Sequence, residues 1–377
     1  TCGVVIENCA FMYNYIGVNL HSACALVKKS LISGNSYAGV YYCSVLFAGV
    51  SDIGCEGKMR LQDNIIGLSS DMKTKIPNGE GVGIHGIVGE YYSFEAENNV
   101  IAGNEGVGIE MTTSNLNNIK ISKNYIGVNR SFEDFGNGGD GIHFPYGVSV
   151  LGSTPVVGGF TTKDSANFIG FNKGNGISGS VPTYNNYVGV TPDYKPMPNE
   201  LDGISLIAGT CEGNMVGYNK GNGITVNIGQ LNNNIIGGDG VHDFPNEGYG
   251  IFAKIGNVIG NRIFNNASGG LAYTQSMYGL QTSQNLFSGE NQPFAINDRA
   301  YIYPPVITSV KRVNGDIIVS GTVKFNDMTF SAPYTLDNEK VGIELFLSEG
   351  EQSAIEYLGY TESNSEGEWS ITLPKYI

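Results

Sequence analysis

The sequence is poor in positive charge. Its 377 residues include only 21 Lys and Arg against 35 Asp and Glu, which gives a formal net charge of -14. Because a protein binds nucleic acid by neutralising phosphates with a basic face, we expect no nucleic-acid partner. The same shortage of cations argues against an anionic polysaccharide as the ligand.

Long apolar runs and helical periodicity are also missing. No run of 18 apolar residues occurs, so no membrane span is expected. No long stretch places apolar residues at i, i+3, i+4 and i+7, which excludes a mainly helical protein.

The six cysteines form no CxxC pair, which argues against a zinc ribbon, and we expect no structural metal site. Cys2, Cys24 and Cys43 follow one another at intervals of 22 and 19 residues. Since a free cysteine packs like a small apolar residue, this spacing predicts stacked, buried thiols. A disulfide between neighbouring coils is the alternative.

Glycine, by contrast, is abundant, with 54 residues, and asparagine is frequent too, a mixture typical of many tight turns. Two short phrases recur in a fixed order: N-x-[IV]-G, followed by G-[IV]. Such recurrence at intervals of a few tens of residues indicates a solenoid. Each phrase alternates at period two and is too short for a helix, so we predict short parallel strands in stacked coils. The N-x-[IV]-G phrases begin at residues 14, 64, 124, 167, 186, 214, 234 and 257, with a variant at 99.

The spacing between the two phrases predicts a double coil. From the Gly of the first phrase to the Gly of the second, the steps are 16, 5, 14, 6, 14, 6 and 13 residues. The long steps carry polar, turn-rich insertions, and we expect these to project from one side, where repeat proteins commonly bind. Their acidic residues leave calcium binding open as a cofactor prediction. The insertions are SSDMKTKIPNGEG, NRSFEDFGNGGD, TPDYKPMPNELD and DGVHDFPNEGY.

Strand alternation assigns the directions of the side chains. The aliphatic residue of G-[IV] should point inward and form one stack, namely Ile84, Ile109, Ile142, Ile177, Ile204, Ile224 and Ile251. The Asn of N-x-[IV]-G should form a hydrogen-bonded ladder at the turns, comprising Asn64, Asn99, Asn124, Asn167, Asn186, Asn214, Asn234 and Asn257. Asp140 and Asp202 occupy the same place as Asn175 and Asn222, which indicates Asx-turn chemistry and argues against catalytic acids.

This pattern resembles the right-handed parallel β-helix repeats of large bacterial secreted and cell-surface proteins, over about residues 1–295. The resemblance implies an all-β solenoid, secreted or displayed on the cell surface, but not one activity, because the fold serves lyases, hydrolases, adhesins and phage spikes. The opening stretch TCGVVIENC already reads as the middle of a repeat. We therefore expect the chain to be a processed or partial form of a longer protein.

A different domain is predicted after the repeats end. We expect the β-helix over residues 1–300 and a β-sandwich over residues 304–377, which this chain need not complete. Runs such as DIIVSGTVKF and VGIELFLSE are strands bounded by turn residues. They resemble the Ig-like modules that follow β-helices in bacterial surface proteins. Trp369, the only Trp, should lie in the core of this domain.

Two outward rows carry candidate site residues. His85, Glu110 and His143 each follow G-[IV], so we expect Glu110 between the two histidines, a row that could bind a metal or act in acid–base catalysis. The alternative is a polar stripe with an ordinary ion pair. Tyr125, Phe168 and Tyr187 should face outward on consecutive coils and could stack on sugar rings as a ligand-binding site. The alternative there is that the insertions fold over the aromatic stripe.

Together these patterns favour a secreted or surface-displayed module for binding, adhesion or spacing. Its partner would be a neutral glycan or another cell-surface protein. One alternative is a carbohydrate-active enzyme, a polysaccharide hydrolase or lyase that uses the row of His85, Glu110 and His143. Another is a cargo or subunit of an exported cell-surface assembly.

Overall fold

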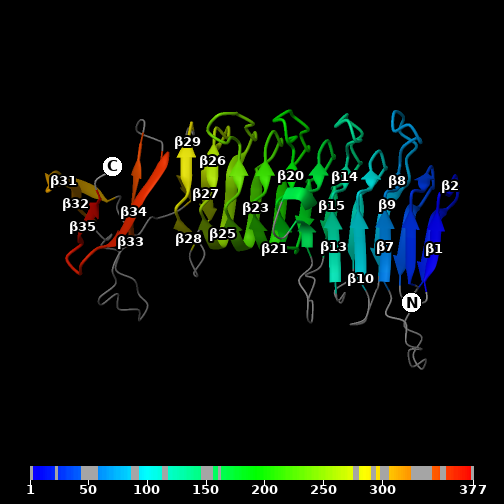
Figure 1. Cartoon of the computed structure of the whole chain (residues 1–377), viewed down its shortest axis with the longest axis horizontal. Helices are drawn as coiled ribbons and strands as arrows, with labels where there is room; N and C mark the ends of the chain where they lie inside the picture. The colour runs from blue at the N-terminus through cyan, green and yellow to red at the C-terminus, as the bar shows by residue number, and fades with distance from the viewer. Residues whose placement is uncertain are drawn as a thin grey trace, which may run out of the picture.

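The chain winds into parallel coils stacked along one long axis, with a small antiparallel domain at the C-terminal end (Figure 1). The predicted all-β, right-handed parallel β-helix is confirmed. Among the described residues, no helix has the length and apolar character needed to cross a membrane. The computed structural model describes residues 3–21, 24–43, 58–85, 93–112, 118–145, 156–159, 163–274, 280–289, 294–297, 305–323, 342–348 and 354–374.

Two sides of the solenoid belong to one 19-stranded parallel sheet. One side contains β1 (Val4–Glu7), β4 (Ala25–Lys28), β7 (Lys58–Gln62), β10 (Ser93–Glu97), β13 (Asn118–Ser122), β16 (Val156–Gly158), β19 (Thr183–Tyr184) and β28 (Leu280–Ser283). The other contains β3 (Ile16–His21), β6 (Ala38–Cys43), β9 (Glu80–His85), β12 (Ile109–Thr112), β15 (Ile142–Phe144), β18 (Ile177–Gly179), β27 (Gly269–Thr274) and β30 (Phe294–Asn297). Long strands span both sides in β21 (Ile204–Glu212), β23 (Ile224–Asn232) and β25 (Tyr249–Ile259).

The third side is an 11-stranded parallel sheet of very short strands. It contains β2 (Ala10–Met12), β5 (Leu31–Ser33), β8 (Ile65–Ile66), β11 (Val100–Ile101), β14 (Tyr125–Ile126), β17 (Phe168–Ile169), β20 (Tyr187–Val188), β22 (Met215–Val216), β24 (Ile235–Ile236), β26 (Arg262–Phe264) and β29 (Leu286–Ser288). A 3₁₀ turn, η1 (Lys163–Ser165), precedes β17.

Aliphatic residues fill the space between the three sides. The predicted stack from Ile109 to Ile251 is confirmed, because each of these residues pairs with the next across consecutive coils. The predicted first member is wrong: Ile109 pairs with Val82, while Ile84 pairs with Met111. All are fully buried, so each coil supplies apolar surface that only its neighbours can cover.

The turn that leads into the third sheet is built around a buried asparagine. In most coils the residue before that asparagine is in the left-handed region, as at Asp63 (φ 57°) and Lys123 (φ 59°), and this sharply redirects the chain. The backbone N–H and the amide of each asparagine both donate to the Oδ1 of the next, at about 3 Å, as from Asn99 to Asn124. The ladder runs through Asn64, Asn99, Asn124, Asn167, Asn186, Asn214, Asn234, Asn261 and Asn285.

The prediction that Asn257 belongs to the ladder is therefore wrong, and Asn261 takes its place. The N-x-[IV]-G letters at residue 257 fall inside the continuous strand β25, where Asn257 pairs with Gln230 and Gln281. The turn comes at Gly260 (φ 68°), one residue before Asn261.

A second ladder, which the repeat phrases did not predict, lines the turn that leaves the third sheet. Its amides also donate to the next Oδ1, at 2.8–3.0 Å, and every member is buried. The two ladders satisfy backbone groups at two corners of every coil, which a buried turn requires. Its members are Asn35, Asn78, Asn104, Asn137, Asn172, Asn199, Asn219, Asn246 and Asn266.

The predicted alternation of long and short coils is confirmed. The long insertions follow β8, β14, β20 and β24 and project from one edge of the solenoid, at the top of Figure 1. Each folds back on itself as a small hairpin closed by a single antiparallel bridge, for example between Val128 and Asp134. We number them hairpin 1 (residues 68–78), hairpin 2 (128–137), hairpin 3 (190–199) and hairpin 4 (238–246).

The C-terminal domain is antiparallel. One sheet contains β31 (Val306–Val313), β32 (Asp316–Thr322) and β35 (Glu368–Leu373), and the other contains β33 (Gly342–Leu347) and β34 (Glu356–Glu362). Trp369 is 4% exposed and packs with Val319 and Ile343, so both sheets contribute to one core. Phe287 of β29 pairs with Ala354, which places this domain against the last strand of the third sheet.

The cysteines depart in part from the predicted buried stack. Cys43 is half-buried and Cys9 is exposed, both as free thiols, while the free thiol that is fully buried is Cys211. Burial raises the pKa of the Cys211 thiol to about 12. Cys24 is half-buried, and Cys2 and Cys55 lie outside the described residues.

Candidate ligand-binding cleft

The four hairpins contact one another in pairs. Lys75 Nζ of hairpin 1 donates to the carbonyl of Gly136 (3.1 Å), and Asn129 Nδ2 of hairpin 2 donates to the carbonyl of Met72 (3.2 Å). In the other pair, the ring of Tyr194 stacks on His242, with centroids 3.8 Å apart. Each pair therefore forms a braced unit.

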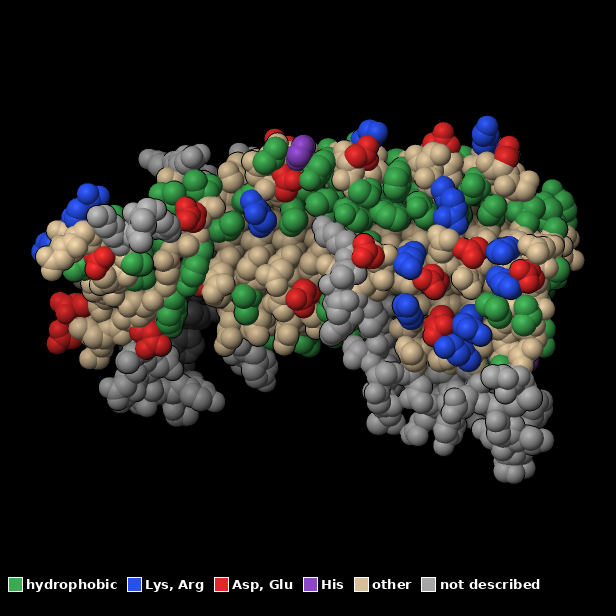
Figure 2. All heavy atoms as spheres, viewed as in Figure 1, with side chains coloured by type: hydrophobic (Ala, Val, Ile, Leu, Met, Phe, Trp, Pro, Cys, Tyr) green, Lys and Arg blue, Asp and Glu red, His purple; other side chains and the backbone are tan. Residues whose placement is uncertain are grey.

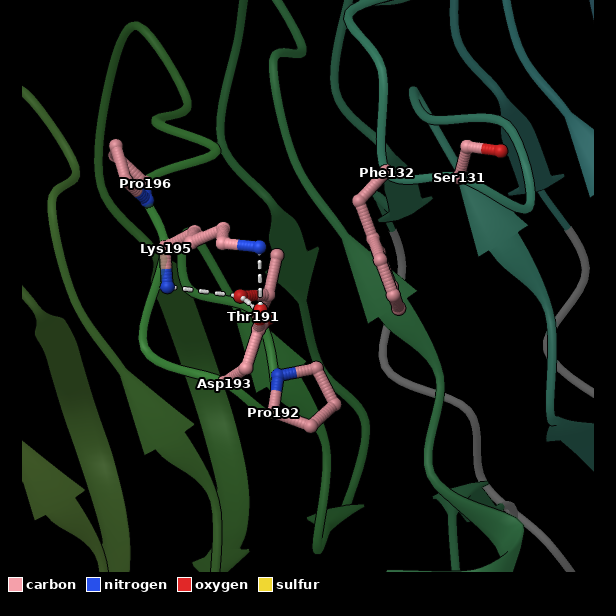
Figure 3. Close-up of a pocket in the computed structure, with 7 residues that line it drawn as sticks. All are labelled: Ser131, Phe132, Thr191, Pro192, Asp193, Lys195 and Pro196. Atoms are coloured by element: carbon pink, nitrogen blue, oxygen red, sulfur yellow. Dashed lines mark hydrogen bonds and ion pairs between the residues drawn. The ribbon is translucent and has the colours of Figure 1, made fainter.

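A cleft of about 640 Å³ lies between the two pairs, where hairpin 2 faces hairpin 3. Figure 3 shows two lining residues on hairpin 2 and five on hairpin 3. The lining combines an aromatic ring and prolines with hydroxyl and charged groups. The lining residues are Ser131, Phe132, Thr191, Pro192, Asp193, Lys195 and Pro196.

The predicted aromatic row lies beside this cleft. Tyr125, Phe168 and Tyr187 are register partners on β14, β17 and β20, with ring centroids 5.0 and 5.5 Å apart. Figure 2 shows the band of apolar side chains that runs along the solenoid below the hairpins. All three side chains are half-buried. The register confirms that the three residues follow one another on consecutive coils, whereas their ligand-binding role stays a prediction.

Insertion side chains fold over this row, as the alternative prediction held. Phe132 of hairpin 2 lies 5.9 Å from Tyr125 and 5.2 Å from Phe168, measured between ring centroids. Arg130 lies over the Tyr125 ring at 5.2 Å and is fixed by hydrogen bonds from its Nη atoms to Asn98. The aromatic surface that lines the cleft therefore belongs to Phe132, with the predicted row as its support.

Sequence reasoning missed Phe132, although the insertions offer a signal. Phe132 (φ 60°), Met72 (φ 57°) and Tyr194 (φ 64°) occupy the same position in hairpins 2, 1 and 3. Each donates its N–H to the carbonyl three residues earlier, as Phe132 does to Asn129 at 3.0 Å. A bulky residue in the left-handed region is uncommon, so its recurrence at one position indicates a side chain needed there.

The polar groups of the cleft form a small network on hairpin 3. Lys195 Nζ lies 2.7 Å from Asp193 Oδ2, and the Thr191 hydroxyl donates to Asp193 Oδ1 at 2.6 Å. Lys195 and then Thr191 lower the pKa of Asp193, which keeps this carboxylate ionised. The ion pair makes the charged part of the lining neutral overall.

The predicted row of His85, Glu110 and His143 is right for one neighbour and wrong for the other. Glu110 pairs with His143, but on its other side it pairs with Gly83, and His85 pairs with Thr112. The sequence GVGI contains the G-[IV] phrase twice, two residues apart. The register selects Gly81 and Val82, so His85 lies two residues further along β9 than predicted.

Glu110 has acidic and basic neighbours. Burial, and then the negative charge of Glu80, raise the pKa of the Glu110 carboxyl. His143 lies within 3.4 Å of the Asp140 carboxylate, whose hydrogen bond raises the pKa of the imidazole. A catalytic role for His85, Glu110 or His143 stays a prediction.

Asp140, His143 and Ser178 have the composition of a catalytic triad without its geometry. His143 Nδ1 lies 2.6 Å from Ser178 Oγ, and the Ser178 hydroxyl also donates to Asp140. In a triad, the acid and the nucleophile contact opposite ring nitrogens, whereas here both lie at Nδ1. Asp140 instead accepts from the backbone N–H of Asn175 at 2.7 Å, a contact between coils and not the local bond of an Asx turn.

A second aromatic row, not predicted, lies on β6, β9 and the preceding coil. Tyr15 stacks on Tyr37 at 5.2 Å, Tyr37 lies 5.7 Å from Tyr41, and Tyr41 stacks on His85 at 5.1 Å. Tyr41 and His85 lie on the 19-stranded sheet, and Tyr15 and Tyr37 directly precede its strands β3 and β6.

Comparisons with known proteins add likenesses of fold. No protein-family model matches the sequence, and no curated protein matches it. The periplasmic alginate epimerase AlgG aligns at 11% identity with a TM-score of 0.37, over 78% of this chain and 77% of that chain. A double mutant of AlgG aligns over the same shares of the two chains, at 12% identity with a TM-score of 0.39. The Dettilon tailspike protein (gp208) aligns at 12% identity with a TM-score of 0.30, over 99% of this chain and 85% of that chain. Likeness at this level carries no conclusion about activity.

Proposed function

We propose that this chain is a secreted or surface-displayed β-helix that binds a neutral glycan in the cleft between hairpins 2 and 3. The observation that carries the proposal is the cleft, with a volume of about 640 Å³ and an aromatic wall at Phe132. An apolar pocket with a few placed polar groups is typical of small-ligand sites. The C–H face of a sugar packs well on an aromatic ring.

A neutral ligand fits the charges. Because Lys195 is paired with Asp193 at 2.7 Å, the cleft offers no unpaired cation among its lining residues for a carboxylated or sulfated sugar. Ser131 and Thr191 add hydroxyl groups, which suit the donors and acceptors of sugar hydroxyls. The formal net charge of -14 would also repel an anionic polysaccharide.

The cleft walls are braced before a ligand arrives. Hairpin 2 is tied to hairpin 1 through Lys75 and Asn129, and hairpin 3 is tied to hairpin 4 through Tyr194. A preformed site loses little entropy on binding, so an uncharged ligand can still be held without an ion pair.

Export rests on the resemblance of the repeats to those of bacterial surface proteins. In that setting the glycan site would make the chain an adhesion module or one subunit of a surface assembly. Both roles depend on glycan binding in the same cleft.

A glycan array combined with a degradation screen on the purified chain tests this function. We expect retention of at least one neutral oligosaccharide, loss of that retention in Phe132→Ala, and no cleavage products. Release of oligosaccharides from a polysaccharide would make the chain an enzyme. Retention of anionic glycans alone would contradict the assignment of a neutral ligand.

A further inference from the structure

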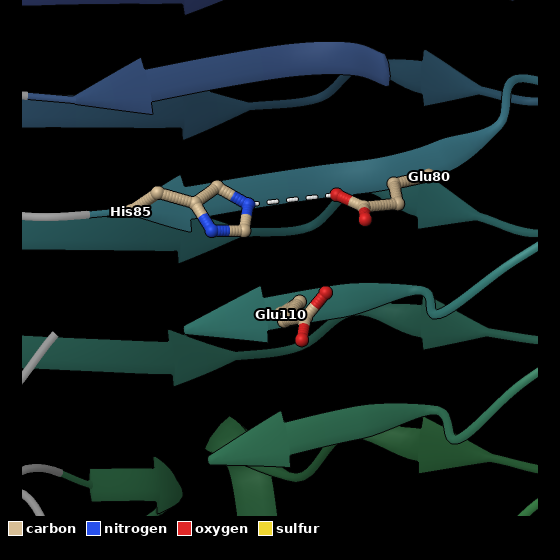
Figure 4. Close-up of side chains that lie close together, drawn as sticks. All are labelled: Glu80, His85 and Glu110. Carbon is tan, nitrogen blue, oxygen red and sulfur yellow. Dashed lines mark ion pairs between the residues drawn. The ribbon is translucent and has the colours of Figure 1, made fainter. Parts of the chain in front are cut away.

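Three metal-ligand side chains converge above Gly83 on the 19-stranded sheet. Glu80 and His85 fold toward each other from the two sides of Gly83 along β9, and Glu110 reaches the same place from β12 (Figure 4). One oxygen or nitrogen atom from each of the three lies within 4.8 Å of the others. The group lies on a different sheet from the glycan cleft.

Gly83 leaves the space in which these atoms meet. A Cβ at this position would lie 2.6 Å from His85 Nε2 and 2.9 Å from Glu80 Oε2. The neighbouring positions in the same outward row carry side chains, namely Tyr41 on β6 and Glu110 on β12. The absence of a side chain at Gly83 therefore opens a gap that the three ligand atoms border.

The hydrogen bonds around His85 aim its free nitrogen at this gap. His85 Nδ1 lies 2.8 Å from Thr112 Oγ1, and the Thr112 hydroxyl donates to the carbonyl of Ile84 at 3.4 Å. The Thr112 oxygen then accepts from Nδ1–H, and in the neutral imidazole Nε2 keeps its lone pair. Tyr41 stacks on the imidazole and fixes its plane.

Two buried acceptor atoms face each other across the gap. His85 Nε2 and Glu80 Oε2 lie 3.5 Å apart, and neither has a hydrogen-bond partner within the described residues. Leaving such atoms unpaired costs free energy, and a cation between them would remove that cost.

We propose that Glu80, His85 and Glu110 bind a divalent first-row metal ion, with zinc as the best match. Two ligands on a tetrahedral zinc ion, at bond lengths of about 2.0–2.2 Å, lie roughly 3.3–3.6 Å apart, and the separation of 3.5 Å between Nε2 and Oε2 matches. Rotation of the Glu110 side chain supplies the third ligand. A site with three protein ligands leaves the fourth position to water.

Calcium suits this place poorly. Calcium takes about six to eight oxygen ligands at roughly 2.3–2.6 Å, whereas this group offers a nitrogen and two carboxylates. The hydrogen bond from Nδ1 to Thr112 is also the kind of outer contact that orients a metal-binding histidine.

Zinc titration of the whole chain, stripped of metal with a chelator, tests the site by calorimetry and by metal content after desalting. We expect one bound ion, and binding at least tenfold weaker in Glu80→Gln, His85→Gln and Glu110→Gln. Gly83→Ala is the sharpest variant, because it keeps all three ligands and fills the gap between them. Thr112→Val should weaken binding by about 10–100-fold, as loss of an orienting contact does.

Two controls separate this site from its neighbours. His143→Gln removes the histidine beside Glu110 and should leave zinc binding unchanged. Cys43→Ser removes the thiol that lies 3.0 Å from His21 Nδ1 and should also leave it unchanged. The cobalt-loaded protein should show no thiolate charge-transfer band, since the proposed ligands are nitrogen and oxygen.

Zinc binding of wild-type strength in both Gly83→Ala and Glu80→Gln would overturn the proposal, as would the absence of binding by the wild-type chain. Loss of binding in Cys43→Ser, or a thiolate band with cobalt, would assign the metal to the pair of His21 and Cys43 instead. Circular dichroism of each variant must match that of the wild type, so that misfolding is not read as loss of a ligand.

Discussion

Phe132 packs edge-on against Phe168, with ring centroids 5.2 Å apart and ring planes at 76°. The first residue lies on an insertion hairpin and the second on the short coil that follows it. This contact joins an insertion hairpin, which only the long coils carry, to the short strand of the third sheet that every coil repeats. It positions the aromatic wall of the cleft on the stacked rings of the third sheet.

The asparagine ladder should be a major source of stability. Asn124→Ala removes a buried amide that donates to Asn167 Oδ1 and accepts from Asn99, so several polar groups lose their partners. At about 1–3 kcal/mol for each unsatisfied buried group, we expect a loss of about 3 kcal/mol or more. Urea unfolding followed by circular dichroism measures it.

Asn257→Ala is the matched control for that experiment. Asn257 is half-buried on β25 and lies outside both ladders, so its replacement should change stability by no more than about 0.5 kcal/mol. Equal losses from the two substitutions would contradict the ladder as the stabilising element.

His143 should titrate above its ordinary pKa. The hydrogen bond that this imidazole donates to the Asp140 carboxylate raises the pKa of His143 above 6.5. Because the folded value is the higher one, the stabilisation is complete below pH 6.5 and is lost as the pH rises through the folded pKa. An NMR titration of the ring protons should show the raised midpoint, and Asp140→Asn should lower it. An unchanged midpoint in that variant would contradict the assigned cause.

Hairpin 4 should depend on Asp239. Burial works against ionisation of this carboxyl, but the backbone N–H groups of His242 and Val241 outweigh it, and the pKa falls to about 2. The depressed value means that the stabilisation is present above pH 3.8 and is lost as the pH falls through about 2.

Hydrogen exchange measures this dependence directly. Asp239→Ala should speed exchange of the Val241 and His242 amides, because both lose their acceptor. Val241→Ala is the control, since that side chain is 84% exposed and holds nothing in place. Equal exchange rates in the two variants would count against Asp239 as the anchor of the hairpin.

The repeat pattern was sufficient to predict the solenoid, the alternation of long and short coils and most of the first ladder. It misplaced His85 because a shift of two residues keeps every side chain on the same face, so alternation does not detect it. The second ladder does not resolve the ambiguity, because Asn78 lies three residues before Gly81 and five before Gly83, each one residue away from the spacing of four that holds from Asn104 to Asn246. Only the pairing of Val82 with Ile109 identifies Gly81 as the glycine of the phrase.

The candidate cleft was less predictable. Its location beside the insertions followed from the spacing, but its lining did not, because Phe132 adopts a left-handed backbone that a bulky residue normally avoids. The group at Glu80, His85 and Glu110 was hidden for a related reason. Its members come together only because Gly83, their neighbour in register, has no side chain.

The most direct test of glycan binding compares dissociation constants for the best neutral oligosaccharide from the array. The chains to compare are the wild type, Phe132→Ala and Tyr37→Ala, the last of which alters the aromatic row on the other sheet. We predict at least tenfold weaker binding, about 1.4 kcal/mol, for Phe132→Ala and no change for Tyr37→Ala. Unchanged affinity in Phe132→Ala, or loss of affinity in Tyr37→Ala alone, would contradict binding in the cleft.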